Sequence, residues 1–228
     1  MIANVRAMVN RGLARAGNAR TAPAVAAAMS RRARTLRTLV TTLSGCAVVL
    51  VARASLADHY RVPSGSMEPT VVVGDQICVN KAAYGLRVPE SETYLAQGAD
   101  PARGDVVVLA SPTDGEVLLK RVVAVPGDVV AVVDGRVAID GAFVPVVELD
   151  GGATVEQLGE HPHALGTSWG GGPDFGPVRV PADGYLVLGD NRGNSRDGRF
   201  FGWVARGAIL GRAVAVCLHD GRPAWQPL

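Results

Sequence analysis

The sequence predicts a mostly β protein: an antiparallel, barrel-like body with a β-rich insertion, carried on one N-terminal transmembrane helix. Three observations support this prediction. Short runs of β-branched residues recur from residue 60 onward, each bounded by Gly, Pro or Asp. The 228 residues include 28 Gly and 14 Pro, a composition that suits many short strands better than long helices. One uncharged apolar run precedes the body, and no later run is long enough to span a bilayer.

The first element is a basic arm over residues 1–35, which we expect to be cytoplasmic. Residues 1–57 contain nine Arg and neither Asp nor Glu, so they carry +9 and leave about −7 for the rest of a chain whose net charge is +2. This asymmetry indicates a membrane surface or a nucleic acid as the partner of the arm. We predict a lipid bilayer as the partner and no nucleic acid.

The second element is a transmembrane anchor over residues 36–57. Residues 38–52 carry no charge, and Arg37 and Arg53 bracket them. This run is short for a spanning helix, which needs about 20 residues, unless both arginines extend to the lipid headgroups. Eight arginines precede the run, so the positive-inside rule places the N-terminus in the cytoplasm and the body outside it. A cleaved secretory signal and a mitochondrial transit peptide are the alternatives.

The third element is a β domain over residues 58–215, followed by a C-terminal tail over residues 216–228. Asp134-Gly135 and Asp140-Gly141 are hairpin turn signals within this domain. Residues 150–177 break the strand pattern with many Gly and Pro, so we expect an insertion or cap over about residues 140–180. The runs that predict strands are 71–73, 76–79, 105–109, 117–125, 128–133, 185–188 and 211–216.

The cysteines and histidines do not indicate a metal site. Cys46, Cys78 and Cys217 show neither metal-ligand spacing nor a disulfide framework. We expect Cys78 and Cys217 to be buried thiols, and a bridge between them is the less favoured alternative. His161 and His163 lack acidic or Cys partners at ligand spacing, so we interpret them as a pair of loop residues.

Three polar segments stand out against the strand pattern. The first is RVPSGSMEPT at residues 61–70, a tight loop between prolines that displays a serine hydroxyl. The second is Lys120-Arg121 within an apolar run that closes on Pro-Gly-Asp. The third is GDNRGNSRDGR at residues 189–199, which lies between apolar strands. Taken singly, the first is most simply a turn and the third a solvated hairpin loop.

Lys120 has the most unusual setting of these residues. Leu118 and Val122 share its face of the strand, and Arg121 points to the other face. A lysine among apolar neighbours either extends to a sheet edge or is desolvated, and desolvation favours the neutral amine that a general base requires. The other lysine, Lys81, fits a solvated strand end. None of the four histidines lies within the three segments, although this alone leaves a Ser-His-Asp triad open.

Together, the three segments resemble the conserved boxes of type I signal peptidases. The matching residues are SGSMEPT at 64–70, KRVV at 120–123 with PGD at 126–128, and the polar segment at 189–199. They occur in the order found in that family and follow an apolar segment placed as in that family. The likeness covers about residues 36–215. Each box is moderately specific, and the three in order are strongly specific.

The resemblance implies a role for each residue at a matching position. Ser66 matches the nucleophile and Lys120 the general base. Ser64 matches the residue whose hydroxyl joins the Ser66 backbone N–H in the oxyanion hole. Ser195 matches the serine that hydrogen-bonds and orients the lysine amine. The positions that match supporting polar residues are Asp190, Arg192, Asp197 and Arg199.

Two positions depart from the family pattern. Gly193 stands where Asp is usual, and Gly198 stands where Ser is usual. Because neither position transfers a proton, we expect these departures to affect the rigidity of the loop and not the activity.

The resemblance implies a membrane-bound serine endopeptidase that removes N-terminal signal peptides from exported preproteins. It implies a single-pass protein of the bacterial cytoplasmic membrane, with its catalytic domain outside the cytoplasm and no metal or cofactor. One alternative is a related processing peptidase with a dedicated substrate, such as an organellar inner-membrane or conjugation-system enzyme. Another is a catalytically inactive, membrane-tethered β module that binds exported peptides.

Overall fold

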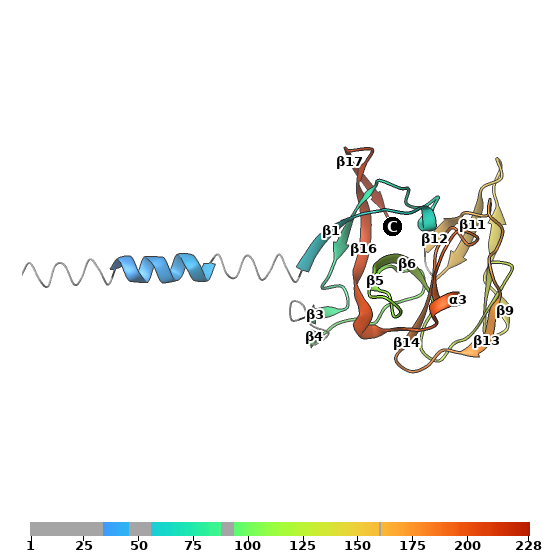
Figure 1. Ribbon diagram of the computed structural model, residues 1–228, viewed down its shortest axis with the longest axis horizontal. Coiled ribbons are helices and arrows are strands. Elements are labelled where there is room, and N and C mark those ends of the chain that lie inside the picture. Colours follow the sequence, from blue (N-terminus) through green and yellow to red (C-terminus); the bar gives the residue numbers. More distant parts are fainter. Residues whose placement is uncertain (1–33, 46–55, 88–93, 160) are drawn as a thin grey trace, which may run out of the picture. The chain divides into compact units, whose positions relative to one another are not determined.

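The computed structural model describes residues 34–45, 56–87, 94–159 and 161–228, which belong to two compact units (Figure 1). In the first unit, residues 34–45 are helical and exposed. Within the described ranges, no helix is both long enough and apolar enough to cross a membrane. Residues 1–33 of the predicted arm and residues 46–55 of the predicted anchor lie outside the described residues.

The second unit is mostly antiparallel β, as the sequence predicted. Its main sheet has the strand order β1-β2-β16-β5-β6-β14-β15, and β17 pairs with β16. Among the described residues β1 and β15 are not paired with each other, so the sheet stays open and the predicted barrel is not closed. The strands of this sheet are β1 (Ala57–Arg61), β2 (Gln76–Asn80), β5 (Val106–Ala110), β6 (Val117–Ala124), β14 (Gly184–Leu188), β15 (Val204–Ala205), β16 (Ile209–His219) and β17 (Arg222–Pro227).

Smaller sheets form the rest of this unit. One has the order β13-β7-β8-β9, one has the order β10-β11-β12, and one is the pair β3-β4. Strands β10 to β13 fall within residues 140–180, where the sequence predicted a β-rich insertion (Figure 1). The strands are β3 (Gly85–Arg87), β4 (Tyr94–Gln97), β7 (Val129–Val133), β8 (Arg136–Ile139), β9 (Ala142–Phe143), β10 (Val146–Glu148), β11 (Thr154–Leu158), β12 (His161–Leu165) and β13 (Phe175–Arg179).

Aspartate–glycine turns connect three of the hairpins. Asp134 and Asp140 have φ of 47° and 50°, and each precedes a glycine of positive φ in the turns β7-β8 and β8-β9, as predicted. Asp220-Gly221 forms the same kind of turn between β16 and β17. The prediction of a separate tail over residues 216–228 is therefore wrong, because these residues complete the main sheet.

Cys78 and Cys217 form a disulfide, so the prediction of two buried thiols is also wrong. Their Cα atoms are 5.8 Å apart, within the usual range for a disulfide. Cys78 lies in β2 and Cys217 in β16, and these strands are neighbours although the two residues are 139 positions apart. The bridge joins two strands that the hydrogen-bond ladder already pairs.

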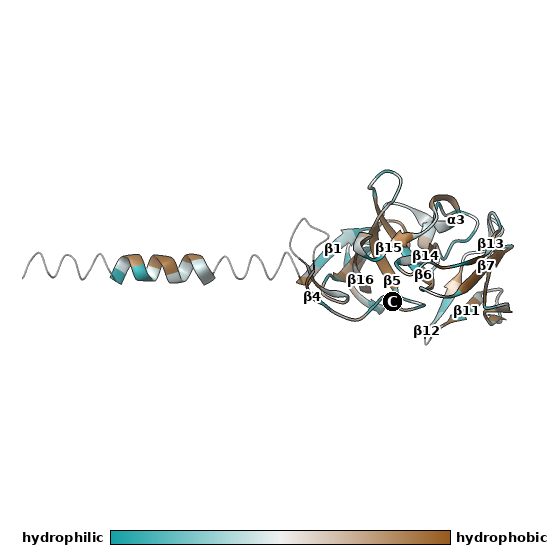
Figure 2. Ribbon diagram, turned by 90° about the horizontal axis from the view of Figure 1, so that it is seen from below, coloured by the Kyte–Doolittle hydropathy of each residue, from teal (hydrophilic) through white to brown (hydrophobic). Residues whose placement is uncertain are grey.

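The main core lies along β5, β6 and β14, whose residues are mostly buried. Figure 2 shows the apolar colouring of β5 and β7. Strand β6 contributes to three apolar clusters: Leu119 packs against one, Val123 belongs to a second, and Leu118 and Val122 line a third. Any polar side chain in the middle of this strand is therefore removed from water, which sets the environment of the site described next.

Candidate active site

Ser66 lies in a short 3-10 turn, η1 (Gly65–Met67), that follows β1. The Met67 side chain is buried in an apolar cluster with Val62. The amide of Gly74 donates a hydrogen bond of 2.9 Å to the Val62 carbonyl oxygen, which closes the loop after the turn. The buried methionine thus fixes the turn from the inside, while Ser66 itself stays partly exposed.

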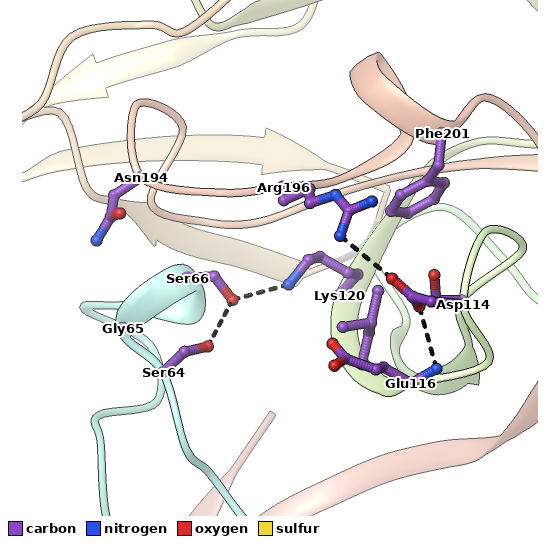
Figure 3. A pocket seen from close by; sticks show the side chains of 11 residues that line it. Ser64, Gly65, Ser66, Asp114, Glu116, Lys120, Asn194, Arg196 and Phe201 are labelled. Carbon is purple, nitrogen blue, oxygen red and sulfur yellow. Dashed lines mark hydrogen bonds and ion pairs between the residues drawn. The ribbon is translucent and has the colours of Figure 1, made fainter.

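The amine of Lys120 contacts the Ser66 hydroxyl (Figure 3). Lys120 Nζ donates to Ser66 Oγ at 2.7 Å and to the Leu119 carbonyl oxygen at 2.9 Å. On the other side, Ser64 Oγ donates to Ser66 Oγ at 3.5 Å. The structure therefore brings together the three residues that the sequence placed at the nucleophile, the base and the oxyanion hole.

Lys120 is buried at 3% exposure, although no carboxylate among the described residues forms an ion pair with it. Leu118 and Val122 belong to the apolar cluster on its face of β6, together with Val107, its partner residue across the sheet. This burial lowers the pKa of Lys120 from 10.5 to about 8, although the charges of Asp197 and Asp190 act to raise it. The desolvation predicted from the strand pattern is confirmed, and a substantial fraction of the amine is neutral near pH 8.

The polar loop of residues 189–199 holds the serine turn through backbone contacts. The Asn191 amide donates to the Ser66 carbonyl oxygen at 3.1 Å, and Asn191 Nδ2 donates to the Gly65 carbonyl oxygen at 3.1 Å. A Cβ at Gly189 would lie 2.3 Å from the Ser66 carbonyl oxygen, so only glycine permits this approach. The sequence did not single out Asn191, although it lies within the third polar segment.

Asp190 joins the serine loop to β6. Its carboxylate accepts hydrogen bonds from Arg121 Nε at 2.9 Å, Arg121 NH2 at 2.7 Å and Thr70 Oγ1 at 2.6 Å. Burial alone would raise the pKa of Asp190, but Arg121 outweighs burial and the pKa is lowered. Asp190 therefore stays charged and links Thr70 of the serine loop to Arg121 of β6, a partner that was not predicted from the sequence.

Asp197 and Arg199 close the loop at its other end. Asp197 is the N-cap of the short helix α3 (Gly198–Phe201), and its Oδ2 accepts a hydrogen bond of 3.0 Å from the Gly189 amide. Arg199 NH2 donates to Asp197 Oδ2 at 2.8 Å and to the Arg192 carbonyl oxygen at 2.6 Å. These contacts tie the start of the loop to its end.

The two glycines that depart from the family pattern both lie in close contacts. A Cβ at Gly193 would lie 2.1 Å from the Trp169 carbonyl oxygen, and one at Gly198 would lie 2.7 Å from a methyl carbon of Leu186. With the backbone as it stands, neither Asp nor Ser fits at these positions. Gly193 therefore allows the segment before β13 to pack closely onto the polar loop, and Gly198 allows the start of α3 to pack closely onto β14.

The predicted bond between Ser195 and the lysine amine is absent from this structure. Ser195 Oγ is buried and makes no hydrogen bond to any described residue. A Cβ placed on Gly189 would lie 2.3 Å from it, so the hydroxyl lies against that backbone. The second acceptor of the Lys120 amine is the Leu119 carbonyl oxygen.

A cavity of about 230 Å³ opens beside the dyad (Figure 3). Ser64, Ser66 and Lys120 line one side of it, and the hairpin between β5 and β6 lines another with Asp114 and Glu116. No group of three His, Cys, Asp or Glu side chains among the described residues could hold a metal ion. Because the partly neutral Lys120 amine lies beside it, the Ser66 hydroxyl can be acylated.

One histidine lies deeper than the sequence indicated. His163 is buried in β12, where its Nε2 is 3.3 Å from Glu156 Oε2 in β11, so its interpretation as a loop residue is wrong. The side chain of His161 lies outside the described parts. The surrounding Gly and Pro obscure the period-two pattern of β11 and β12, so this buried pair was not predicted from the sequence.

Comparison with known proteins places the chain in a family. The family model described as signal peptidase, peptidase S26, matches residues 35–218. Signal peptidase I of Pseudomonas fluorescens is 40% identical over 199 residues, which cover 77% of this chain and 70% of that protein. Signal peptidase I of Pseudomonas aeruginosa is 36% identical over 192 residues, which cover 74% of this chain and 67% of that protein.

A more distant curated relative and one solved structure are also similar to this chain. Signal peptidase I T of Bacillus subtilis is 33% identical over 170 residues, which cover 74% of this chain and 78% of that protein. A crystal structure of a signal peptidase I from Enterococcus faecalis is 27% identical and aligns over 50% of this chain and 97% of that chain, with a TM-score of 0.35. The family model and the aligned relatives extend over most of the sequence, and the chain belongs to the signal peptidase family, peptidase S26.

Proposed function

We propose that this protein is a membrane-bound serine endopeptidase that removes N-terminal signal peptides from exported preproteins, with Ser66 as nucleophile and Lys120 as general base. One observation carries the assignment of the dyad: a buried amine whose pKa is about 8 lies 2.7 Å from a serine hydroxyl beside an open cavity. The curated relatives named signal peptidase I support the choice of substrate.

In the proposed mechanism, the neutral Lys120 amine accepts the Ser66 proton as Ser66 Oγ attacks the scissile carbonyl carbon. The Ser66 backbone N–H and the Ser64 hydroxyl stabilise the oxyanion of the tetrahedral intermediate, for which the position of Ser64 Oγ, 3.5 Å from Ser66 Oγ, is suitable. The Lys120 ammonium then donates its proton to the leaving amine. A water molecule, deprotonated by the same lysine, hydrolyses the acyl-enzyme.

The other candidate bases have less support. Lys81 keeps 29% of its side chain exposed, lies 3.7 Å from the Asp58 carboxylate and does not line the cavity beside Ser66. In the described part of the chain, no hydrogen bond or ion pair joins a histidine to Ser66; His219 pairs with Asp75, and His163 lies beside Glu156. A dyad of serine and lysine therefore fits the geometry better than a triad with histidine.

We further propose that one N-terminal span, residues 36–57, anchors the protein in the bacterial cytoplasmic membrane, with the basic arm of residues 1–35 in the cytoplasm. The +9 charge of residues 1–57 supports this topology. The disulfide between Cys78 and Cys217 supports a catalytic domain outside the cytoplasm, because disulfides persist in oxidising compartments. Exported preproteins and the lipid bilayer are the proposed partners.

The test is cleavage of a purified preprotein by the full chain and by its Ser66→Ala variant in detergent or lipid. We expect the wild type to release the signal peptide and the variant to fold but not to cleave, because it lacks only the attacking oxygen. A panel of unrelated preproteins separates a general enzyme from one with a dedicated substrate. Near-normal turnover by Ser66→Ala would remove Ser66 as nucleophile, and a wild type that cleaves none of the preproteins would remove the proposed substrate class.

A further inference from the structure

A buried charge network lies between the insertion and the polar loop, and the proposed mechanism does not use it. Glu156 in β11 is 0% exposed, and both of its carboxylate oxygens accept hydrogen bonds from Arg192, at 3.2 Å from NH1 and 2.5 Å from NH2. His163 Nε2 lies 3.3 Å from Glu156 Oε2 and 3.9 Å from Asp190 Oδ1. The insertion thus supplies a carboxylate that binds Arg192 and an imidazole that lies near Asp190, both residues of the polar loop.

Glu156 is held in its charged form. Burial would raise the pKa of Glu156, but His163 and the charge and hydrogen bonds of Arg192 outweigh burial, and the pKa is lowered. Arg192 is itself buried, so its guanidinium depends on Glu156 for a counter-charge. A neutral residue in place of Glu156 would leave that cation buried without a carboxylate in contact.

Arg192 in turn fixes the backbone that supports the nucleophile. Its Nε donates to the Gly189 carbonyl oxygen at 3.2 Å, and its NH1 donates to the Gly135 carbonyl oxygen. Gly189 lies against the Ser66 carbonyl, and the Asn191 amide donates to that same oxygen. The path from the insertion to Ser66 therefore consists of contacts between buried groups, with one arginine in the middle.

We propose that Glu156 is a positioning residue of the active site, which acts through Arg192 to fix residues 189–192 against the serine turn and so keeps Ser66 Oγ within reach of Lys120. This inference rests on the proposed function. Through Glu156, the insertion would then contribute to catalysis. Glu156 does not line the cavity beside the dyad, so its effect falls on the alignment of Ser66 and not on substrate binding.

The test compares Glu156→Gln, which keeps the size of the side chain and removes its charge, with the wild type in preprotein cleavage. We expect kcat to fall about 10- to 100-fold, since a misplacement of about 1 Å can cost 100-fold in rate, and KM to stay within about two-fold. The matched control is Glu148→Gln in β10, an exposed glutamate of the same insertion, which should keep wild-type kcat and KM.

A double variant, Glu156→Gln with Arg192→Met, separates positioning from a general loss of stability. Removing both charges should restore thermal stability toward the wild type. We expect kcat to stay low, because methionine cannot donate to the Gly189 carbonyl oxygen. This variant also carries the test if the single variant does not fold.

Recovery of kcat together with stability in the double variant would overturn the inference, and so would wild-type kcat in Glu156→Gln. Both of these outcomes leave the proposed function standing, since the wild type cleaves in each. A wild type that cleaves no preprotein would instead overturn the proposed function and this inference with it.

Discussion

Two buried regions of this protein hold their cations in opposite ways. Lys120 lies among apolar side chains with no carboxylate in contact among the described residues, and its pKa falls to about 8. Arg121, the next residue, is equally buried but forms two hydrogen bonds with Asp190, whose pKa is lowered. Burial alone therefore does not decide the charge of a side chain. The buried Arg121 guanidinium stays charged and is paired with Asp190, whereas the buried Lys120 amine has no contacting carboxylate and can lose its proton, so the protein places a base and a structural cation one residue apart.

The largest expected effect comes from Lys120→Arg, which turns the dyad region into a second charged region. The guanidinium does not deprotonate and cannot accept the Ser66 proton, so we expect kcat/KM to fall by roughly 10⁴-fold or more. The measurement is preprotein cleavage, with Lys81→Arg as the control that should stay active because Lys81 is partly exposed and paired with Asp58. An active Lys120→Arg enzyme would mean that Lys120 is only a structural cation.

The next largest effect comes from removing the counter-ion in the other region. Asp190→Asn leaves Arg121 buried without a carboxylate, and we expect the free energy of unfolding to fall by about 3–5 kcal/mol in denaturant titrations. The control is Asp100→Asn, which removes an exposed partner of Arg206 and should cost less than about 1 kcal/mol. If Asp190→Asn is as mild as the control, the contrast between the two regions does not hold.

The smallest effect concerns the pH dependence of the dyad. Because the pKa of Lys120 is about 8, the rate should rise with pH through that value and level off above it. An amine with a lowered pKa destabilises the folded state below pH 8, by roughly 3 kcal/mol, and this cost vanishes as pH rises toward 10.5. Lys120→Met should therefore be more stable than the wild type at pH 7, by up to that amount, and no more stable near pH 11. A rate that is flat between pH 6 and 9 would contradict the assignment of Lys120.

The parts of the molecule that depend on local sequence were predicted well. The Asp-Gly turns of the β7-β8-β9 hairpins follow from two adjacent residues that both accept positive φ. The burial of Lys120 follows from neighbours two positions away on the same strand. The same turn signal at Asp220-Gly221 was present but unused, and it would have shown that the C-terminal residues form a hairpin.

The features that depend on distant contacts were missed. Cys78 and Cys217 pair because β2 and β16 are neighbours, and no spacing along the chain reveals that. Glu156 and Arg192 meet across 36 positions, and their pairing depends on how the insertion packs under the polar loop. Ser195 was predicted wrongly for a different reason. The resemblance to the family implied a hydrogen bond from Ser195 to the Lys120 amine, but the rotamer and local packing of a side chain decide which bonds it forms, and Ser195 Oγ forms none with the described residues.

Strand β6 has a consequence for how far its sequence can be altered. Lys120 and Arg121 meet different partners because successive side chains of a strand face opposite sides of the sheet. Deleting one residue from the hairpin before β6 while the ladder with β5 is kept would exchange the two faces. The guanidinium would then meet Ser66, and the amine would face Asp190, where a carboxylate keeps it protonated. A shift of the register by one position, with Lys120 and Arg121 both retained, would thus leave Ser66 without a base.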